Sequence, residues 1–258
     1  MMRTDPGAAE QAISAYEQGD YATAVRLWQP LAEAGDRGAQ YALAVCLANG
    51  EGVDVDLGAA ARWLQRAAEQ GHSSAQRLLA AFHAAGQGVT RDPAAAREWY
   101  RRAAEQGDAE ARAALAMLYQ RGEGGPVDIN AAVEWYTRAA EQEEPGAQHN
   151  LATLYYSGDG VDRDLAKALH WYRRAAEQGQ AMSQRALGLC YLYGDAVAKN
   201  RVEAFRWLTL AAMHAALDQR EMRDEVLALR NSIAVEMSTE EVEAALSWAR
   251  EWQPRGNG

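Results

Sequence analysis

The sequence predicts an all-α fold, a solenoid of stacked helix pairs with a period of 36 residues. Alanine, the strongest helix former, occurs 56 times in 258 residues. Tryptophan, leucine and glycine recur at one constant spacing over most of the chain. Each expected helix has a single apolar stripe, which it cannot bury alone. Stacked units bury these stripes continuously, as in repeat proteins.

The period of 36 residues holds over five units without an insertion. Three kinds of residue define it: a tryptophan, a leucine and a glycine in each unit. These positions are Trp63, Trp99, Trp135, Trp171 and Trp207; Leu43, Leu79, Leu115, Leu151 and Leu187; and Gly50, Gly86, Gly122, Gly158 and Gly194. We expect the leucines in the core and the tryptophans, such as Trp135, buried between successive units.

Each unit is expected to hold two helices joined by a short loop. In the unit that begins at residue 144, apolar residues at helical spacing over 147–155 predict the first helix, and Gly158 ends it. Asp164 is placed to cap the second helix, because its carboxylate accepts the free N–H groups of the first turn. A second apolar stripe over 168–176 predicts that helix, which ends at Gly179.

The two ends of the array depart from the period, as solenoid ends do. The sequence predicts an N-terminal capping helix pair, five repeats, C-terminal capping helices with a capping box at Ser238, and a disordered tail. One turn is expected to differ, at 143–146, because Glu143 replaces the usual terminal glycine. The boundaries are 1–35, then 36–71, 72–107, 108–143, 144–179 and 180–215, then 216–253 and 254–258.

The repeated unit resembles the Sel1-like repeat, a relative of the tetratricopeptide repeat. The resemblance is carried by the pattern A-x-x-x-L-[AG], a G-x-G-V loop and the run W-[YL]-x-R-A-A-E-Q-G, and it covers residues 36–215, with a truncated first unit at 8–35. The family implies a right-handed α/α superhelix that scaffolds protein complexes and is common in bacteria. It implies no reaction.

Composition and motifs exclude several other classes of function. The net charge of −10 argues against nucleic acid as a partner, and no apolar segment is long enough for membrane insertion. No two histidines have the spacing of metal ligands, and no phosphate-binding or nucleophile motif occurs, so we expect no metal, no cofactor and no catalytic residue. Cys46 and Cys190 lie four periods apart, too far for a disulfide.

An enzyme acting on a cell-wall or β-lactam-type substrate is the alternative interpretation. It rests on a cysteine-rich branch of the Sel1-like family linked to penicillin binding and β-lactam hydrolysis. That branch has paired cysteines within each repeat, and this chain lacks them. The first ten residues contain no apolar core of a secretory signal, and the thiols are unpaired, so we expect a cytoplasmic location.

The leading hypothesis is a scaffold or adaptor that binds a partner protein or peptide in the concave groove of the solenoid. Resemblance to tetratricopeptide superhelices implies that the first helix of each unit lines this groove. Its variable positions mix aromatic residues, a methionine and arginines, the types enriched at interface hot spots. The expected binding residues are Tyr41, Val45, Asn49, Arg77, Met117, Arg121, His149, Thr153, Tyr156, Arg185, Leu189 and Tyr193.

Overall fold

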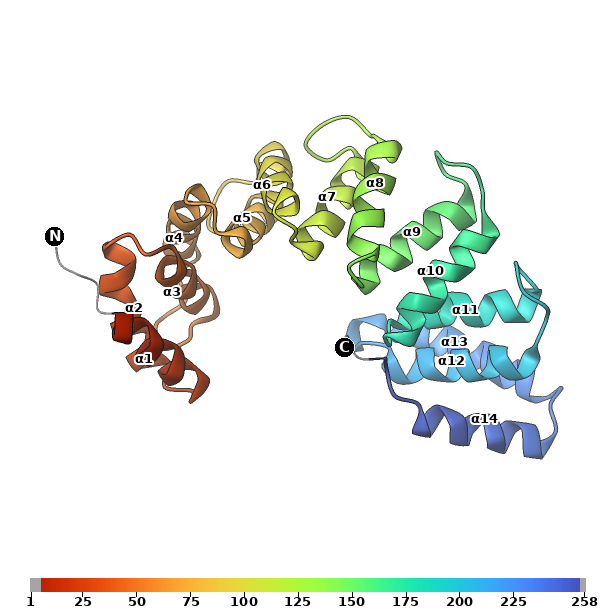
Figure 1. Cartoon of the computed structure of the whole chain (residues 1–258). Helices are drawn as coiled ribbons and strands as arrows, with labels where there is room; N and C mark the ends of the chain where they lie inside the picture. The colour runs from red at the N-terminus through yellow and green to blue at the C-terminus, as the bar shows by residue number, and fades with distance from the viewer. Residues whose placement is uncertain (1–5, 256–258) are drawn as a thin grey trace. The chain divides into compact units, whose positions relative to one another are not determined.

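The structure is a computed structural model that describes residues 6–255, and within that range it contains helices and turns but no strand (Figure 1). The all-α fold of consecutive helix pairs is confirmed. The α-helices are α1 (Pro6–Glu17), α2 (Tyr21–Glu33), α3 (Arg37–Asn49), α4 (Leu57–Glu69), α5 (Ser73–Ala85), α6 (Pro93–Glu105), α7 (Ala109–Arg121), α8 (Ile129–Ala140), α9 (Pro145–Ser157), α10 (Leu165–Glu177), α11 (Ala181–Tyr193), α12 (Arg201–His214), α13 (Arg220–Ala234) and α14 (Thr239–Glu251), with a 3₁₀ turn at Leu217–Gln219.

The chain forms two compact units, one up to Asp128 and the other from Ile129 onward. In the first unit, α3 packs on α4 and α5 on α6, and each second helix also packs on the first helix of the following pair. The second unit repeats this arrangement with α8 to α12 and adds α13 and α14, which both pack on α12. The stacking buries the apolar stripe of each helix between its neighbours.

The helix ends follow the signals in the sequence. Asp56, Asp92 and Asp164 accept hydrogen bonds from backbone N–H groups of α4, α6 and α10. The first helices end at glycines in the left-handed conformation, with φ between 68° and 85°. The capping box at Ser238 opens α14, as predicted.

The second glycine of each loop has a role that the sequence alone does not reveal. A Cβ atom at Gly88 would lie 2.1 Å from the carbonyl oxygen of Leu57 in the preceding repeat. The loop therefore packs directly on the start of α4, and only glycine fits this contact. The equivalent residue in the last repeat is Ala196, which takes the left-handed conformation with φ of 56°.

The core is built on the repeated leucines, which are at most 4% exposed, from Leu43 to Leu187. The expectation for the tryptophans is only partly right: Trp99 and Trp207 are buried, but Trp63, Trp135 and Trp171 are only partly buried. The next residue, Tyr136, is fully buried. The indole of Trp135 instead has the Arg138 guanidinium 4.6 Å from its ring centre, so the tryptophan lies at the edge of the core.

The prediction of an altered turn at 143–146 is wrong. Glu143 has a φ of 64°, in the same left-handed region as Gly107 and Gly179, and its N–H bonds to the carbonyl of Ala140 as the glycines bond in their turns. Its carboxylate forms an ion pair with Arg174 and accepts a 3.0 Å hydrogen bond from Gln148. These contacts offset the cost of a side chain in this conformation.

The tail expected to be disordered from residue 254 is ordered at its beginning. The N–H of Arg255 donates to the carbonyl of Glu177 at 2.8 Å, and its guanidinium lies 2.7 Å from the carboxylate of the same residue. Residues 256–258 lie outside the described residues.

Candidate functional site

The twelve residues expected to bind a partner all lie on first helices, α3, α5, α7, α9 and α11, and none of them is fully buried. In the first unit several are engaged with their neighbours. The ring of Tyr41 stacks on His72, with centres 4.7 Å apart. Arg77 forms ion pairs with Asp108 at 3.2 Å and Glu110 at 2.6 Å. This part of the face is held by contacts within the chain.

In the second unit, five of the twelve residues come together around one cavity of about 310 Å³ between α9, α10 and α11. We call this cavity the α9–α11 pocket. Its lining is His149, Thr153, Tyr156, Tyr172, Met182, Arg185, Ala186, Leu189 and Cys190. Tyr193, the sixth predicted residue of this unit, is not among them, and its side chain is 58% exposed.

Sequence reasoning placed Tyr172 only in the apolar stripe of the second helix. In the structure its hydroxyl lies 3.1 Å from that of Thr153, whose Oγ1 donates to the main-chain carbonyl of His149. The equivalent position is a tyrosine in two other repeats, Tyr100 and Tyr136, and a leucine in the remaining two. The sequence therefore contains no signal that sets Tyr172 apart.

His149 is held as a neutral imidazole. Its Nδ1 lies 2.8 Å from the hydroxyl of Ser183, and its ring packs at a tilt against Tyr172, with centres 5.6 Å apart. Burial lowers the pKa of His149 from 6.5 to about 4, because the charged form loses its hydration. The group therefore carries no charge at neutral pH.

Two further groups of the pocket also keep their protons. The Tyr156 hydroxyl donates a 2.8 Å hydrogen bond to Asp195, and this bond to a carboxylate, with burial, raises the pKa of Tyr156 to about 12. Burial raises the pKa of the Cys190 thiol to about 11, so it is not a thiolate at neutral pH. Arg185, 3.5 Å from Glu225 of α13, is the one permanently charged side chain of the lining.

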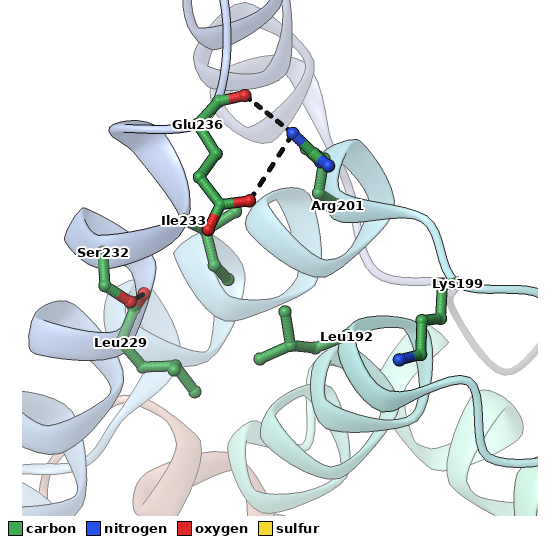
Figure 2. Close-up of a pocket in the computed structure, with 7 residues that line it drawn as sticks. All are labelled: Leu192, Lys199, Arg201, Leu229, Ser232, Ile233 and Glu236. Carbon is green, nitrogen blue, oxygen red and sulfur yellow. Dashed lines mark hydrogen bonds and ion pairs between the residues drawn. The ribbon is translucent and has the colours of Figure 1, made fainter.

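A second cavity of about 360 Å³ lies between α11, α12 and α13, with Leu192, Leu229 and Ile233 among its lining residues (Figure 2). Arg201 at its rim donates to the main-chain oxygen of Glu236 at 2.8 Å and lies 3.6 Å from the carboxylate of that residue. None of the twelve predicted residues lines this cavity.

The structure gives no support to a metal centre. No group of three or more His, Cys, Asp or Glu side chains in residues 6–255 is arranged to hold a metal ion. Cys46 and Cys190 are both buried and unpaired with each other, as the sequence indicates. Among residues 6–255, no helix combines the length and the apolar composition that a transmembrane span requires.

Comparison with known proteins identifies the repeated unit. The Sel1 repeat matches six segments, which together make up most of the chain: 14–36, 38–72, 73–108, 109–144, 145–180 and 181–215. The chain belongs to the Sel1 repeat family. The first Sel1 repeat, at 14–36, overlaps the segment 8–35 that the sequence indicated as a truncated unit.

Two solved structures show the same fold. A Sel1 repeat protein from Oxalobacter formigenes is 26% identical, with a TM-score of 0.80 over 95% of this chain and 100% of that chain. The protective antigen c5321 of uropathogenic Escherichia coli, which has a Sel1-like repeat fold, is 27% identical, with a TM-score of 0.60 over 95% of this chain and 60% of the antigen. A comparison with curated protein sequences gives no match.

Proposed function

We propose that this Sel1 repeat protein is a non-catalytic scaffold that binds a partner protein or peptide through the first helices of its repeats, with the α9–α11 pocket as the anchor site. Sel1 repeat proteins are generally protein-interaction scaffolds. The observation that carries the proposal is that five residues at variable positions of two successive repeats line a single pocket. A pocket of this kind accepts the side chain that anchors a partner.

The lining favours an apolar or aromatic anchor next to an acidic residue. Met182, Ala186 and Leu189 give the pocket an apolar wall, and the paired hydroxyls of Thr153 and Tyr172 offer hydrogen bonds. The guanidinium of Arg185 lies 3.5 Å from the carboxylate of Glu225, which is long for an ion pair, and the Glu225 side chain is 68% exposed. A carboxylate of the partner competes readily with so exposed a pair, because Arg binds carboxylates through two parallel hydrogen bonds.

The chemistry of the pocket supports binding rather than catalysis. Ser183, the hydroxyl nearest to the His149 imidazole, is fully buried, and a substrate has no access to it. The Cys190 thiol keeps its proton at neutral pH. A nucleophile has to be both activated and accessible, and neither group meets both conditions. Hydrolysis of nitrocefin by the purified protein would contradict this part of the proposal.

Site-specific photocrosslinking tests where the partner binds. A photoreactive phenylalanine analogue at Leu189, in the pocket, is expected to capture the partner in cells. The same analogue at His170, an exposed residue of α10 outside the pocket, is the matched control. Equal capture from both positions would place the partner elsewhere.

Affinity measurements with the captured partner then test the face itself. The triple change Met117→Ala, Tyr156→Ala, Tyr193→Ala is expected to weaken binding at least tenfold, about 1.4 kcal/mol, with the helical circular dichroism retained. Leu189→Glu alone places a negative charge in the apolar wall and is expected to weaken binding similarly. Unchanged affinity in both variants would move the site to another surface.

A further inference from the structure

Helix α4 lacks an ion pair that the second helices of the next two repeats, α6 and α8, contain. In α6 the carboxylate of Glu98 lies 2.9 Å from Arg102, one turn later, and in α8 Glu134 pairs with Arg138 in the same way. In α4 the arginine is kept as Arg66, but the residue one turn before it is Arg62. An attractive pair at i and i+4 has become a repulsive one, which destabilises an isolated helix.

The two arginines of α4 lack acidic partners. Neither Arg62 nor Arg66 forms an ion pair with any residue in the range 6–255, although the chain has ten more acidic than basic side chains. The guanidinium of Arg66 lies 4.7 Å from the ring centre of Trp63, which holds it in place without neutralising it. The nearby carboxylate of Glu69 accepts a hydrogen bond from Gln65 instead.

Both arginines line a cavity of about 400 Å³ between α4, α5 and the loop that follows α5. Leu79 and Val89 give it an apolar side, and His83 also lines it. The Nδ1 atom of His83 is buried without a hydrogen-bond partner among the described residues. Two arginines without acidic partners thus line one open space, in a protein of negative net charge.

We propose that this cavity is a binding site for a phosphate dianion. Two guanidinium groups match the double charge of a phosphate group, and their planar forks donate paired hydrogen bonds to its oxygens. A single carboxylate would neutralise only one of the two arginines. The site shares no residue with the α9–α11 pocket, and its existence does not depend on the proposed scaffold function.

The test is a titration of the full chain at pH 8, followed by the backbone amide resonances in two-dimensional NMR at constant ionic strength. The probes are inorganic phosphate, phenyl phosphate and acetate, with sodium chloride as the balancing salt. We expect saturating shifts of the amides of Gly58, Arg62 and Gly88 with a phosphate probe, and at least tenfold weaker binding of acetate. Saturation by acetate at the same affinity, or shifts that chloride reproduces, would overturn the proposal.

Phenyl phosphate separates two sources of the dianion. Binding tighter than that of inorganic phosphate assigns the site to an organic monoester whose carbon part contacts Leu79 and Val89. Equal or weaker binding assigns it to the free ion. If neither probe saturates, the site does not exist.

The variant Arg62→Glu separates binding from folding. It restores the glutamate–arginine pair of α6 and α8, so we expect the fold and thermal stability to be retained while phosphate binding falls at least tenfold. Arg26→Glu, at an exposed arginine of α2, makes the same change in net charge and is the matched control, with binding unchanged. Phosphate affinity retained in Arg62→Glu, or lost equally in both variants, would refute the assignment.

Discussion

The side-chain amide of Gln178, at the end of α10, donates a 2.9 Å hydrogen bond to the Oε1 atom of Gln148, at the start of α9. The Nε2 atom of Gln148 in turn donates to the carbonyl of Ala140 in the preceding repeat at 3.0 Å. Gln148 is fully buried. The same chain of bonds recurs around Gln40, Gln76 and Gln184, with His214 in the place of the second glutamine in the last repeat.

Replacing Gln148 by leucine is expected to destabilise the protein by about 1–3 kcal/mol, because the Ala140 carbonyl and the Gln178 amide lose their buried partner. Urea unfolding measures the loss. A double-mutant cycle with Gln178→Ala isolates the bond between the two glutamines. Gln65→Ala, which removes an exposed bond to Glu69, is the control. Strictly additive effects of Gln148→Leu and Gln178→Ala would show that the two residues are not coupled.

At Glu143, a comparison of glycine and alanine measures the strain of the left-handed turn. Both changes remove the contacts to Arg174 and Gln148, but only glycine adopts a positive φ without cost. We expect Glu143→Gly to be more stable than Glu143→Ala by about 1 kcal/mol, measured by urea unfolding. Two variants of equal stability would mean that the turn opens when the glutamate contacts are lost.

Alanine substitutions of the two neighbouring aromatic residues of α8, Trp135 and Tyr136, should reduce the stability of the protein by very different amounts. Tyr136→Ala removes a fully buried ring and is expected to cost about 3–5 kcal/mol, since the surrounding helices collapse only partly into the cavity. Trp135→Ala removes a ring that is only partly buried, and we expect about 1–2 kcal/mol. Thermal unfolding ranks the two, and a larger shift for Trp135→Ala would contradict the position of its ring at the core edge.

Deletion of one whole period, residues 72–107, is expected to leave a folded, shorter helical protein. The deletion joins Gly71 to Asp108, which caps α7 as His72 caps α5. Leu115 then takes the place of Leu79 against α4, because each repeat contacts only its neighbours. Far-UV circular dichroism and analytical size-exclusion chromatography provide the check. Loss of the helical signal or aggregation would show that the repeats are not interchangeable.

Mild acid should destabilise the fold through His149. Its pKa is about 4 in the folded protein and near 6.5 in the unfolded chain, so the unfolded chain binds a proton first as the pH falls. Stability is fully present above pH 6.5 and declines toward pH 4, by at most about 1.4 kcal/mol per pH unit from this residue. Urea unfolding between pH 7.5 and 5 is expected to show a shallower decline in His149→Gln than in the natural protein. Parallel pH profiles would exclude this contribution.

Local signals determined the repeat architecture in advance. Spacing of the tryptophans, leucines and glycines fixed the period, the helix ends and the buried leucine position from Leu43 to Leu187. Capping residues such as Asp164 and Ser238 bind backbone groups three residues away, so their effect can be predicted from the adjacent sequence alone. The same reasoning misjudged Glu143, because the contacts that stabilise its backbone come from Arg174, 31 residues away.

For the candidate site, too, the sequence predicted the local features but not the contacts between helices. Helical spacing identified His149, Thr153, Tyr156, Arg185 and Leu189 as variable positions of first helices, but not that they surround one pocket with Tyr172 of the second helix. The sequence also did not reveal that the glutamine of the repeated A-A-E-Q run, such as Gln178, bonds to a buried partner. By itself, the sequence determined the period and the helix boundaries, because these depend on the nearest residues along the chain. Only the tertiary structure decided which polar side chains form hydrogen bonds between helices and which arginines have no acidic partner. Those relationships depend on distances between residues that are about 30 positions apart in the sequence.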